Sequence, residues 1–180
     1  MKGKIFWSPV LFLLLLASPA CDKEEEIPLS GTATIDSKLT FSDDKQTYVI
    51  YGFLFSDARR VPFPGSVKPD ITVYNDESSV SLMTGNYLDS FYLEGEYNDA
   101  ASAVSAFNGL KTVNPAMITW TGMASPLAEG QVWVYRTDRE QYAKIRIIEL
   151  ETGTHEDKVY ASCTFEWAFQ PDGSTNFPAR

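Results

Sequence analysis

The sequence predicts a mainly β fold: an antiparallel β-sheet sandwich or meander with one short helix packed on it. Three observations support this prediction. Several segments alternate apolar and polar residues with a period of two, which is the pattern of strands with one buried face. Short polar turns separate consecutive segments, as in antiparallel connections. Only one segment, residues 98–110, has the features of a helix.

The first half of the domain is expected to contain strands at 32–41, 46–55, 70–75, 79–84 and 90–94. The third and fourth of these form a hairpin around the polar residues 76–78. Residues 56–69 contain two arginines, three prolines and a glycine, so we expect no long regular element there. Because function is often carried by long irregular segments, this one is a candidate functional loop.

The expected helix has clear start and stop signals. Asn98 or Asp99 can cap its N-terminus, its interior is rich in alanine, and Gly109 suits the position just after its end. Val104 and Phe107, with nearby alanines, form a narrow apolar stripe that can lie on a sheet.

The second half is expected to return to strands at 117–123, 132–137, 141–150 and 158–170. In the last of these, apolar residues alternate with polar ones from Val159 to Phe169, which places Cys163 on the apolar face. We therefore expect Cys163 to be a buried structural thiol.

The N-terminus reads as an export segment. Residues 1–20 combine two lysines, an apolar run at 10–17 and small residues at the end, which is typical of a signal peptide. Cys21 follows directly and resembles the acylated cysteine of the bacterial lipoprotein lipobox, although Ser18 and Pro19 are unusual there. The alternative is plain secretion with Cys21 free.

Residues 21–29 are expected to be a lipidated, acidic tether in front of a single β-rich domain at 30–180. The run of one lysine and four acidic residues at 22–26 resembles the export signal of surface lipoproteins in Bacteroidetes. This resemblance implies an outer-membrane protein held by its lipid at the cell surface. If Cys21 carries lipid, Cys163 has no disulfide partner.

Composition excludes several classes of function. The chain has 15 basic and 24 acidic residues, a formal net charge of −9, which argues against nucleic-acid binding. His155 is the only histidine and lies in a polar turn, so zinc sites built on several His or Cys ligands are excluded. No nucleophile elbow or phosphate-binding loop is present. We expect no enzymatic activity, and the sequence leaves any metal ligand unknown.

The C-terminal third resembles a known family. Its segments YRTD at 135–138, YAKIRI at 142–147 and FEWAFQPDG at 165–173 are similar to the closing strands of the HmuY-type haem-binding lipoproteins of Bacteroidetes. The resemblance implies an all-β fold, an outer-membrane lipid anchor and capture of haem outside the cell. It covers roughly 45 residues and includes no haem ligand of the family.

Two hypotheses for the ligand follow. If haem or a similar porphyrin is bound, Met83, Met117, Met123 and His155 have the chemistry to hold its iron, and Met117 and Met123 should line a deep apolar slot. The alternative is a glycan-binding or structural accessory of a surface uptake complex. In that case Trp120 and Trp133 should be exposed and coplanar, ready to stack on sugar rings.

Three basic residues could also contribute. Arg136, Lys144 and Arg146 could form a cationic strip on neighbouring strands, suited to propionates or an acidic partner. Cross-strand pairing with Glu149 or Glu166 is the other explanation for their placement. The expected partners are the membrane, a small-molecule ligand and an outer-membrane transporter.

Overall fold

The structure is a computed structural model that describes residues 26–42, 47–86 and 88–177. The predicted signal peptide at 1–20, the lipid attachment at Cys21 and the first part of the tether lie outside these residues. None of the helices in the described ranges is long and apolar enough to span a membrane.

The fold is mainly antiparallel β, as the sequence predicted, and its ten strands in the described residues form one sheet. Its strands are β1 (Ser30–Phe41), β2 (Tyr48–Leu54), β3 (Arg59–Phe63), β4 (Ile71–Asn75), β5 (Val80–Thr84), β6 (Phe91–Glu96), β7 (Met123–Ala124), β8 (Gln131–Arg136), β9 (Tyr142–His155) and β10 (Lys158–Gln170). The helices are η1 (Phe55–Asp57), α1 (Ala100–Gly109) and η2 (Pro115–Met117).

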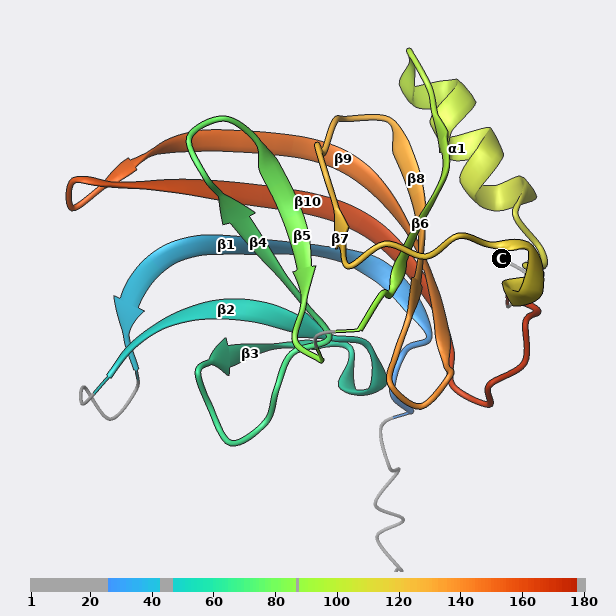
Figure 1. Ribbon diagram of the computed structural model, residues 1–180, viewed down its shortest axis with the longest axis horizontal. Coiled ribbons are helices and arrows are strands. Elements are labelled where there is room, and N and C mark those ends of the chain that lie inside the picture. Colours follow the sequence, from blue (N-terminus) through green and yellow to red (C-terminus); the bar gives the residue numbers. More distant parts are fainter. Residues whose placement is uncertain (1–25, 43–46, 87, 178–180) are drawn as a thin grey trace, which may run out of the picture.

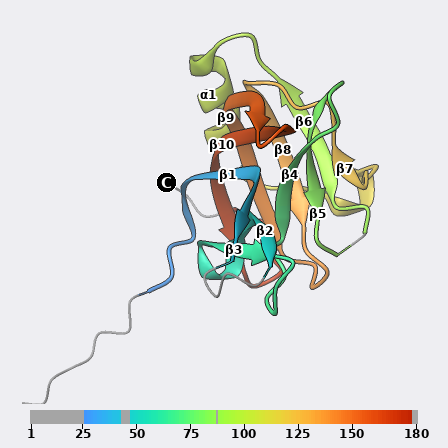
Figure 2. The ribbon, with the colours of Figure 1, turned by 90° about the vertical axis from the view of Figure 1, so that its left-hand side faces the viewer.

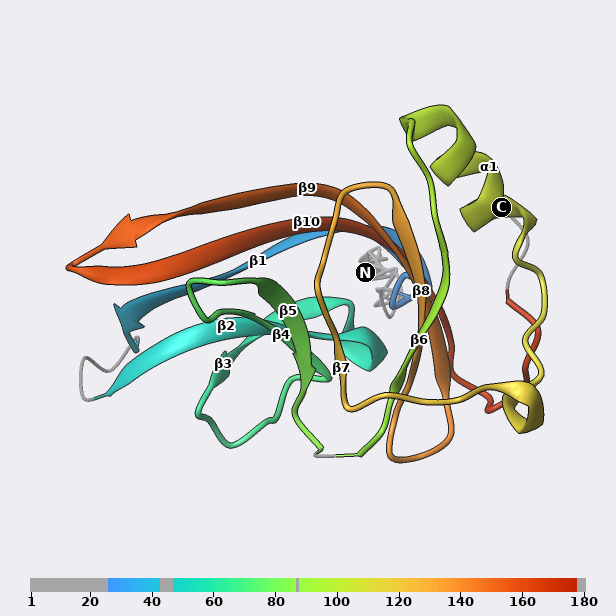
Figure 3. The ribbon, with the colours of Figure 1, turned by 45° about the horizontal axis from the view of Figure 1, so that its top comes forward.

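The sheet curves until its two edges nearly meet. The strand order is β6-β8-β9-β10-β1-β2-β4-β5-β7, with β3 paired to β2 beside this path. Phe91 in β6 and Thr121, just before β7, form an isolated bridge with N–H···O distances of 2.9 and 2.8 Å. In Figures 1 and 3 the long strands β9, β10, β1 and β2 form one layer, and β4, β5 and β7 lie across it.

The main hydrophobic core lies between these layers, and aromatic rings dominate it. Phe53 and Phe55 pack against Phe165, Trp167 and Phe169 of β10, with ring centroids 5.3–5.9 Å apart. The alternation predicted in β10 therefore holds from residue 161 to residue 169, and Cys163 is fully buried in this core. Burial raises the pKa of the Cys163 thiol to about 12, which fits a structural thiol.

α1 packs on the outer face of the sheet, away from the aromatic core (Figures 1 and 2). Asp99 caps it by accepting a hydrogen bond from the Ser102 N–H at 2.8 Å, as predicted for one of the two candidate caps. Ala103 and Phe107 are buried against the sheet. Val104 is 36% exposed and Ala100 is also exposed, so the predicted apolar stripe is confirmed at Ala103 and Phe107 and wrong at the other two positions.

Two segments differ from the prediction. Residues 56–69 contain a strand, β3, which pairs with β2 from Arg59 to Phe63. Proline is tolerated there because β3 is an edge strand, where a missing N–H leaves no ladder bond unmade. Residues 117–123 were expected to be a strand, but the chain forms η2 and then runs irregularly until Met123. Asn114 caps η2 by accepting from the Ala116 N–H, with Pro115 at its start.

Candidate functional site

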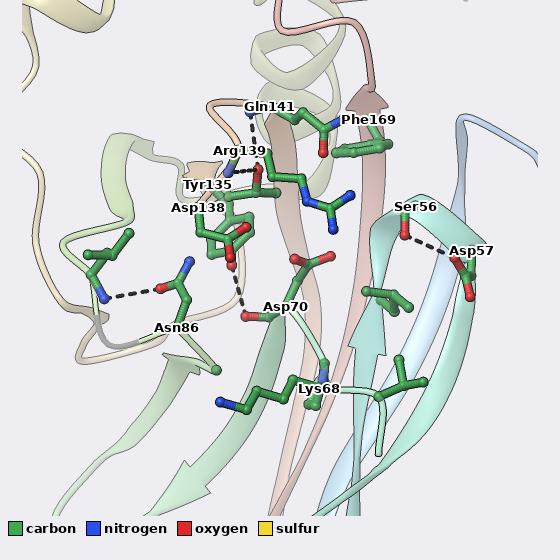
Figure 4. A pocket seen from close by; sticks show the side chains of 16 residues that line it. Ser56, Asp57, Lys68, Asp70, Asn86, Tyr135, Asp138, Arg139, Gln141 and Phe169 are labelled. Carbon is green, nitrogen blue, oxygen red and sulfur yellow. Dashed lines mark hydrogen bonds between the residues drawn. The ribbon is translucent and has the colours of Figure 1, made fainter. Parts of the chain in front are cut away.

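A cavity of about 640 Å³ lies where β2, β8 and β10 meet the loops before β4 and after β5. Its floor is apolar and includes Leu54, Tyr135 and Phe169, which belong to the last residues of these strands. Charged side chains surround the floor (Figure 4). They are Asp57, Lys68, Asp70, Asp138 and Arg139.

Backbone contacts hold Asp70 at the centre of the cavity. Its Oδ2 accepts a hydrogen bond from the Phe55 N–H at 2.8 Å, and its backbone N–H donates to the Phe53 carbonyl at 2.9 Å. Its own carbonyl accepts from the Tyr135 hydroxyl at 3.0 Å. Asp70 is therefore fixed by the end of β2 and by β8, and its second carboxylate oxygen faces the cavity (Figure 4).

The carboxylate of Asp70 is poorly solvated. Burial is the main cause that raises its pKa from 3.8 to about 6, and the nearby charges of Asp138 and Asp57 act in the same direction. The Phe55 N–H and the Arg139 guanidinium act against this shift. Near neutral pH the group is thus mostly ionised, but a small change in its surroundings changes its protonation.

The β8–β9 turn presents the cation that faces Asp70. Thr137 shapes this turn because its Oγ1 accepts from the backbone N–H groups of Arg139 and Gln141, at 3.2 and 3.1 Å. Figure 4 shows the Arg139 guanidinium pointing toward the Asp70 carboxylate. Within the described residues, neither Arg139 nor Lys68 forms an ion pair or a side-chain hydrogen bond.

Two amides complete the polar wall. Asn86 uses its Oδ1 to accept from the Leu88 N–H at 3.0 Å, and its amide nitrogen turns toward Tyr135 and Asp138 (Figure 4). Gln141 donates through Nε2 to the Pro171 carbonyl at 2.6 Å, which leaves its Oε1 as an acceptor. The cavity therefore offers donors, acceptors and both signs of charge. Its volume lies in the ~300–1,000 Å³ range of small-molecule sites.

The predicted porphyrin slot is not formed by the residues named for it. Met117 is 82% exposed in η2 and Met123 is 47% exposed in β7, and neither lines the cavity. β7 instead places Met123 directly opposite Met83 of β5, which is 37% exposed. His155 ends β9 and lines a separate groove of about 260 Å³ near Tyr160.

The predicted tryptophan platform is also absent. Trp133 is only 4% exposed because its strand turns it into the core, where its Nε1 donates to Gln131 at 3.0 Å. Trp120 is half-buried on the outer face, with the Arg136 guanidinium 4.5 Å from its ring centroid. The expectation that both rings are exposed and coplanar was wrong, because they lie on opposite faces of the sheet.

The predicted cationic strip is covered. Lys144 is buried, and its Nζ donates to the carbonyls of Phe107 and Leu110 at 2.7 and 2.9 Å, at the end of α1. Arg146 pairs with Glu166 across β9 and β10, with a shortest distance of 2.7 Å. The alternative explanation, cross-strand pairing, is thus confirmed for Arg146, and Lys144 is not accessible to a ligand.

Part of this site was visible in the sequence. The segment 56–69 was expected to carry function, and it contains Asp57 and Lys68, two of the charged residues that line the cavity. Asp70 and Arg139 were not predicted as ligand-binding residues, and a single sequence does not distinguish a carboxylate after a proline or an arginine in a hairpin turn from ordinary loop residues. Among the described residues, no group of three or more His, Cys, Asp or Glu side chains could hold a metal ion.

No family model matches the chain, and no curated protein sequence matches it significantly.

Proposed function

We propose that the protein is a non-enzymatic binding lipoprotein of the bacterial outer membrane, and that it binds a small molecule in the cavity around Asp70. The observation that supports this most is the combination of volume and charge. The cavity is as large as a typical small-molecule site, and two cations on its wall, Arg139 and Lys68, form no ion pair within the described residues. Such groups gain more from a ligand than from the protein itself.

The proposed location rests on the sequence of the first 26 residues. A signal peptide, a lipidated Cys21 and the acidic run behind it would hold the domain outside the outer membrane. There it can capture a ligand and pass it to a transporter in the same membrane. External protease should remove the domain from whole cells, and protection until the outer membrane is broken would refute surface exposure.

A substitution that fills the cavity with a larger side chain tests the binding proposal. Val67 is a rim residue that is 42% exposed, so Val67→Trp should block the cavity without disturbing the core. Val159→Trp is the matched control, since Val159 is 39% exposed and lies in β10 outside the cavity. Protein purified from its own cells should carry a ligand in native mass spectrometry. Val67→Trp should lose that mass and Val159→Trp should keep it; retention by both variants would refute the site.

Haem remains a second candidate, favoured by the pairing of Met83 and Met123. These two thioethers are exposed and belong to directly opposed residues of β5 and β7, and a thioether is a known ligand of haem iron. Titration with haemin should then give a shifted Soret band that is lost in Met83→Ala and kept in Met117→Ala. A spectrum identical to that of free haemin would remove this candidate.

A further inference from the structure

The cavity contains two opposite charges that face each other without pairing. Asp70 is held by the Phe55 N–H on one side, and Arg139 extends from the β8–β9 turn on the other (Figure 4). Their charges interact, since Arg139 lowers the pKa of Asp70, but they form no ion pair. Both side chains line the cavity, so a third group that enters it can contact each of them.

Each of these side chains has unused bonding capacity. A guanidinium has five N–H donors, and none of those of Arg139 has an acceptor within the described residues. The Asp70 carboxylate uses Oδ2 for the Phe55 N–H, while its other oxygen has no hydrogen bond there. A ligand between them can satisfy a planar fork of donors and an acceptor at the same time.

The charge pattern selects among ligand classes. A ligand with only negative charge would meet Asp70 and Asp138, and a ligand with only positive charge would meet Arg139 and Lys68. Either one gains a favourable contact and an unfavourable one. A molecule that carries an ammonium and a carboxylate on neighbouring atoms makes a favourable contact with each group.

We propose that this cavity binds a free α-amino acid as its zwitterion, with the carboxylate on Arg139 and the ammonium on Asp70 and Asp138. This assignment rests on the proposed function of the cavity and deepens it. The carboxylate can make two parallel hydrogen bonds to the guanidinium. The remaining volume and the apolar surfaces of Leu54, Val67 and Leu88 accommodate the amino-acid side chain.

The zwitterion makes binding dependent on pH. The ammonium needs an ionised Asp70, whose pKa is about 6 in the empty cavity. The groups that face Asp70 are Arg139, Asp138 and Asp57, with Lys68 on the same wall. Affinity should be highest near pH 7–8. It should fall as pH decreases below 6, by up to about tenfold per unit, and fall again at alkaline pH as the ligand's ammonium loses its proton.

The test is a thermal-shift and calorimetric screen of the mature protein against each standard amino acid, with D-glucose and haemin as comparison ligands. At least one amino acid should bind with a dissociation constant below about 1 mM. Asp70→Asn should weaken it by about tenfold or more, because the amide keeps the acceptor for the Phe55 N–H but loses the charge. Asp157→Asn, which changes the same charge on the β9–β10 turn, should have no effect.

Capped analogues of the best ligand identify the charges that are recognised. The N-acetylated and the C-amidated forms should each bind at least about tenfold more weakly than the free amino acid. Equal binding of either analogue, or no binding by any amino acid, overturns the proposal. Binding of glucose or haemin that Val67→Trp abolishes would preserve the cavity as a site and overturn only the amino-acid assignment.

Discussion

The outer face under α1 and the cavity around Asp70 differ in whether their charged side chains are paired within the protein. Under α1, Lys144 donates to two carbonyls at the end of the helix, and Arg146 is paired with Glu166. In the cavity, Asp70 and Arg139 face each other and form no ion pair. The first region buries its charges and pairs them within the protein, whereas in the cavity Asp70 is partly buried and Arg139 is exposed.

This difference distinguishes charges that support the fold from charges that are available to a ligand. Removing a charge from water costs free energy unless the protein supplies partners for it. The outer face supplies them, so its charges position α1 on the sheet. In the cavity, the Phe55 N–H and the Arg139 charge do not offset the burial of Asp70, so its ionised carboxylate lowers the stability of the fold near neutral pH. Residues that are costly for stability and open to a cavity are typical of binding sites.

The largest expected effect is on the outer face. Lys144→Met removes the ammonium that bonds the carbonyls of Phe107 and Leu110, and leaves both acceptors without that partner. The free energy of unfolding should decrease by about 2–4 kcal/mol in a urea titration. Lys111→Met, an exposed lysine just after the same helix, should change it by less than about 0.5 kcal/mol. Equal effects of the two substitutions would mean that the buried ammonium does not hold α1.

The cavity should respond in the opposite direction. The pKa of Asp70 is 3.8 when unfolded and about 6 when folded, so the folded protein binds its proton more tightly. Its contribution to stability is therefore lost as pH rises from about 4 to about 6. Asp70→Asn should stabilise the protein by about 1–3 kcal/mol at pH 7.5 and have little effect at pH 4. Destabilisation at pH 7.5, measured by urea denaturation, would show that the carboxylate is fully compensated.

The ion pair under α1 gives a smaller effect. Glu166→Gln keeps an acceptor for Arg146 but removes the charge from a pair whose side chains are 12% and 13% exposed. We expect a loss of about 1–2 kcal/mol. Asp36→Asn is the matched control, because the Asp36–Arg60 pair is 22% and 44% exposed and should contribute less than about 0.5 kcal/mol. Similar losses in both variants would contradict the distinction between the buried pair and the exposed one.

The sequence predicted the fold better than the site, for a physical reason. Strand periodicity is a local property, so β10 and the burial of Cys163 could be read from residues 158–170 alone. The edge strand β3 was missed because its two arginines and its proline mask its pairing with β2. Whether a short polar segment pairs as an edge strand depends on packing around it and not on a local pattern of residues.

The site depends on contacts between residues that are far apart in the sequence. Asp70 and Arg139 are 69 positions apart in the sequence, and only closure of the sheet brings them to one cavity. Trp133 and Lys144 were predicted as site residues from their residue type. The alternation of side chains along β8 places Trp133 in the core, and α1 covers Lys144. Charge and aromaticity can be counted in a sequence, whereas the partners that use them are set by the fold.

The smallest expected effect on stability is the most direct test of the cavity itself. Arg139→Gln removes an exposed cation that has no ion pair, so the free energy of unfolding should change by less than about 0.5 kcal/mol. The pKa of Asp70 should nevertheless rise further above 6, because the guanidinium opposes the effect of burial. A ¹³C NMR titration of the Asp70 carboxyl measures this, with Lys111→Gln as the control that leaves the pKa unchanged. If Arg139→Gln also leaves the pKa of Asp70 unchanged, the two side chains do not face each other in solution. The cavity would then not contain the opposed, unpaired charges that distinguish it from the outer face.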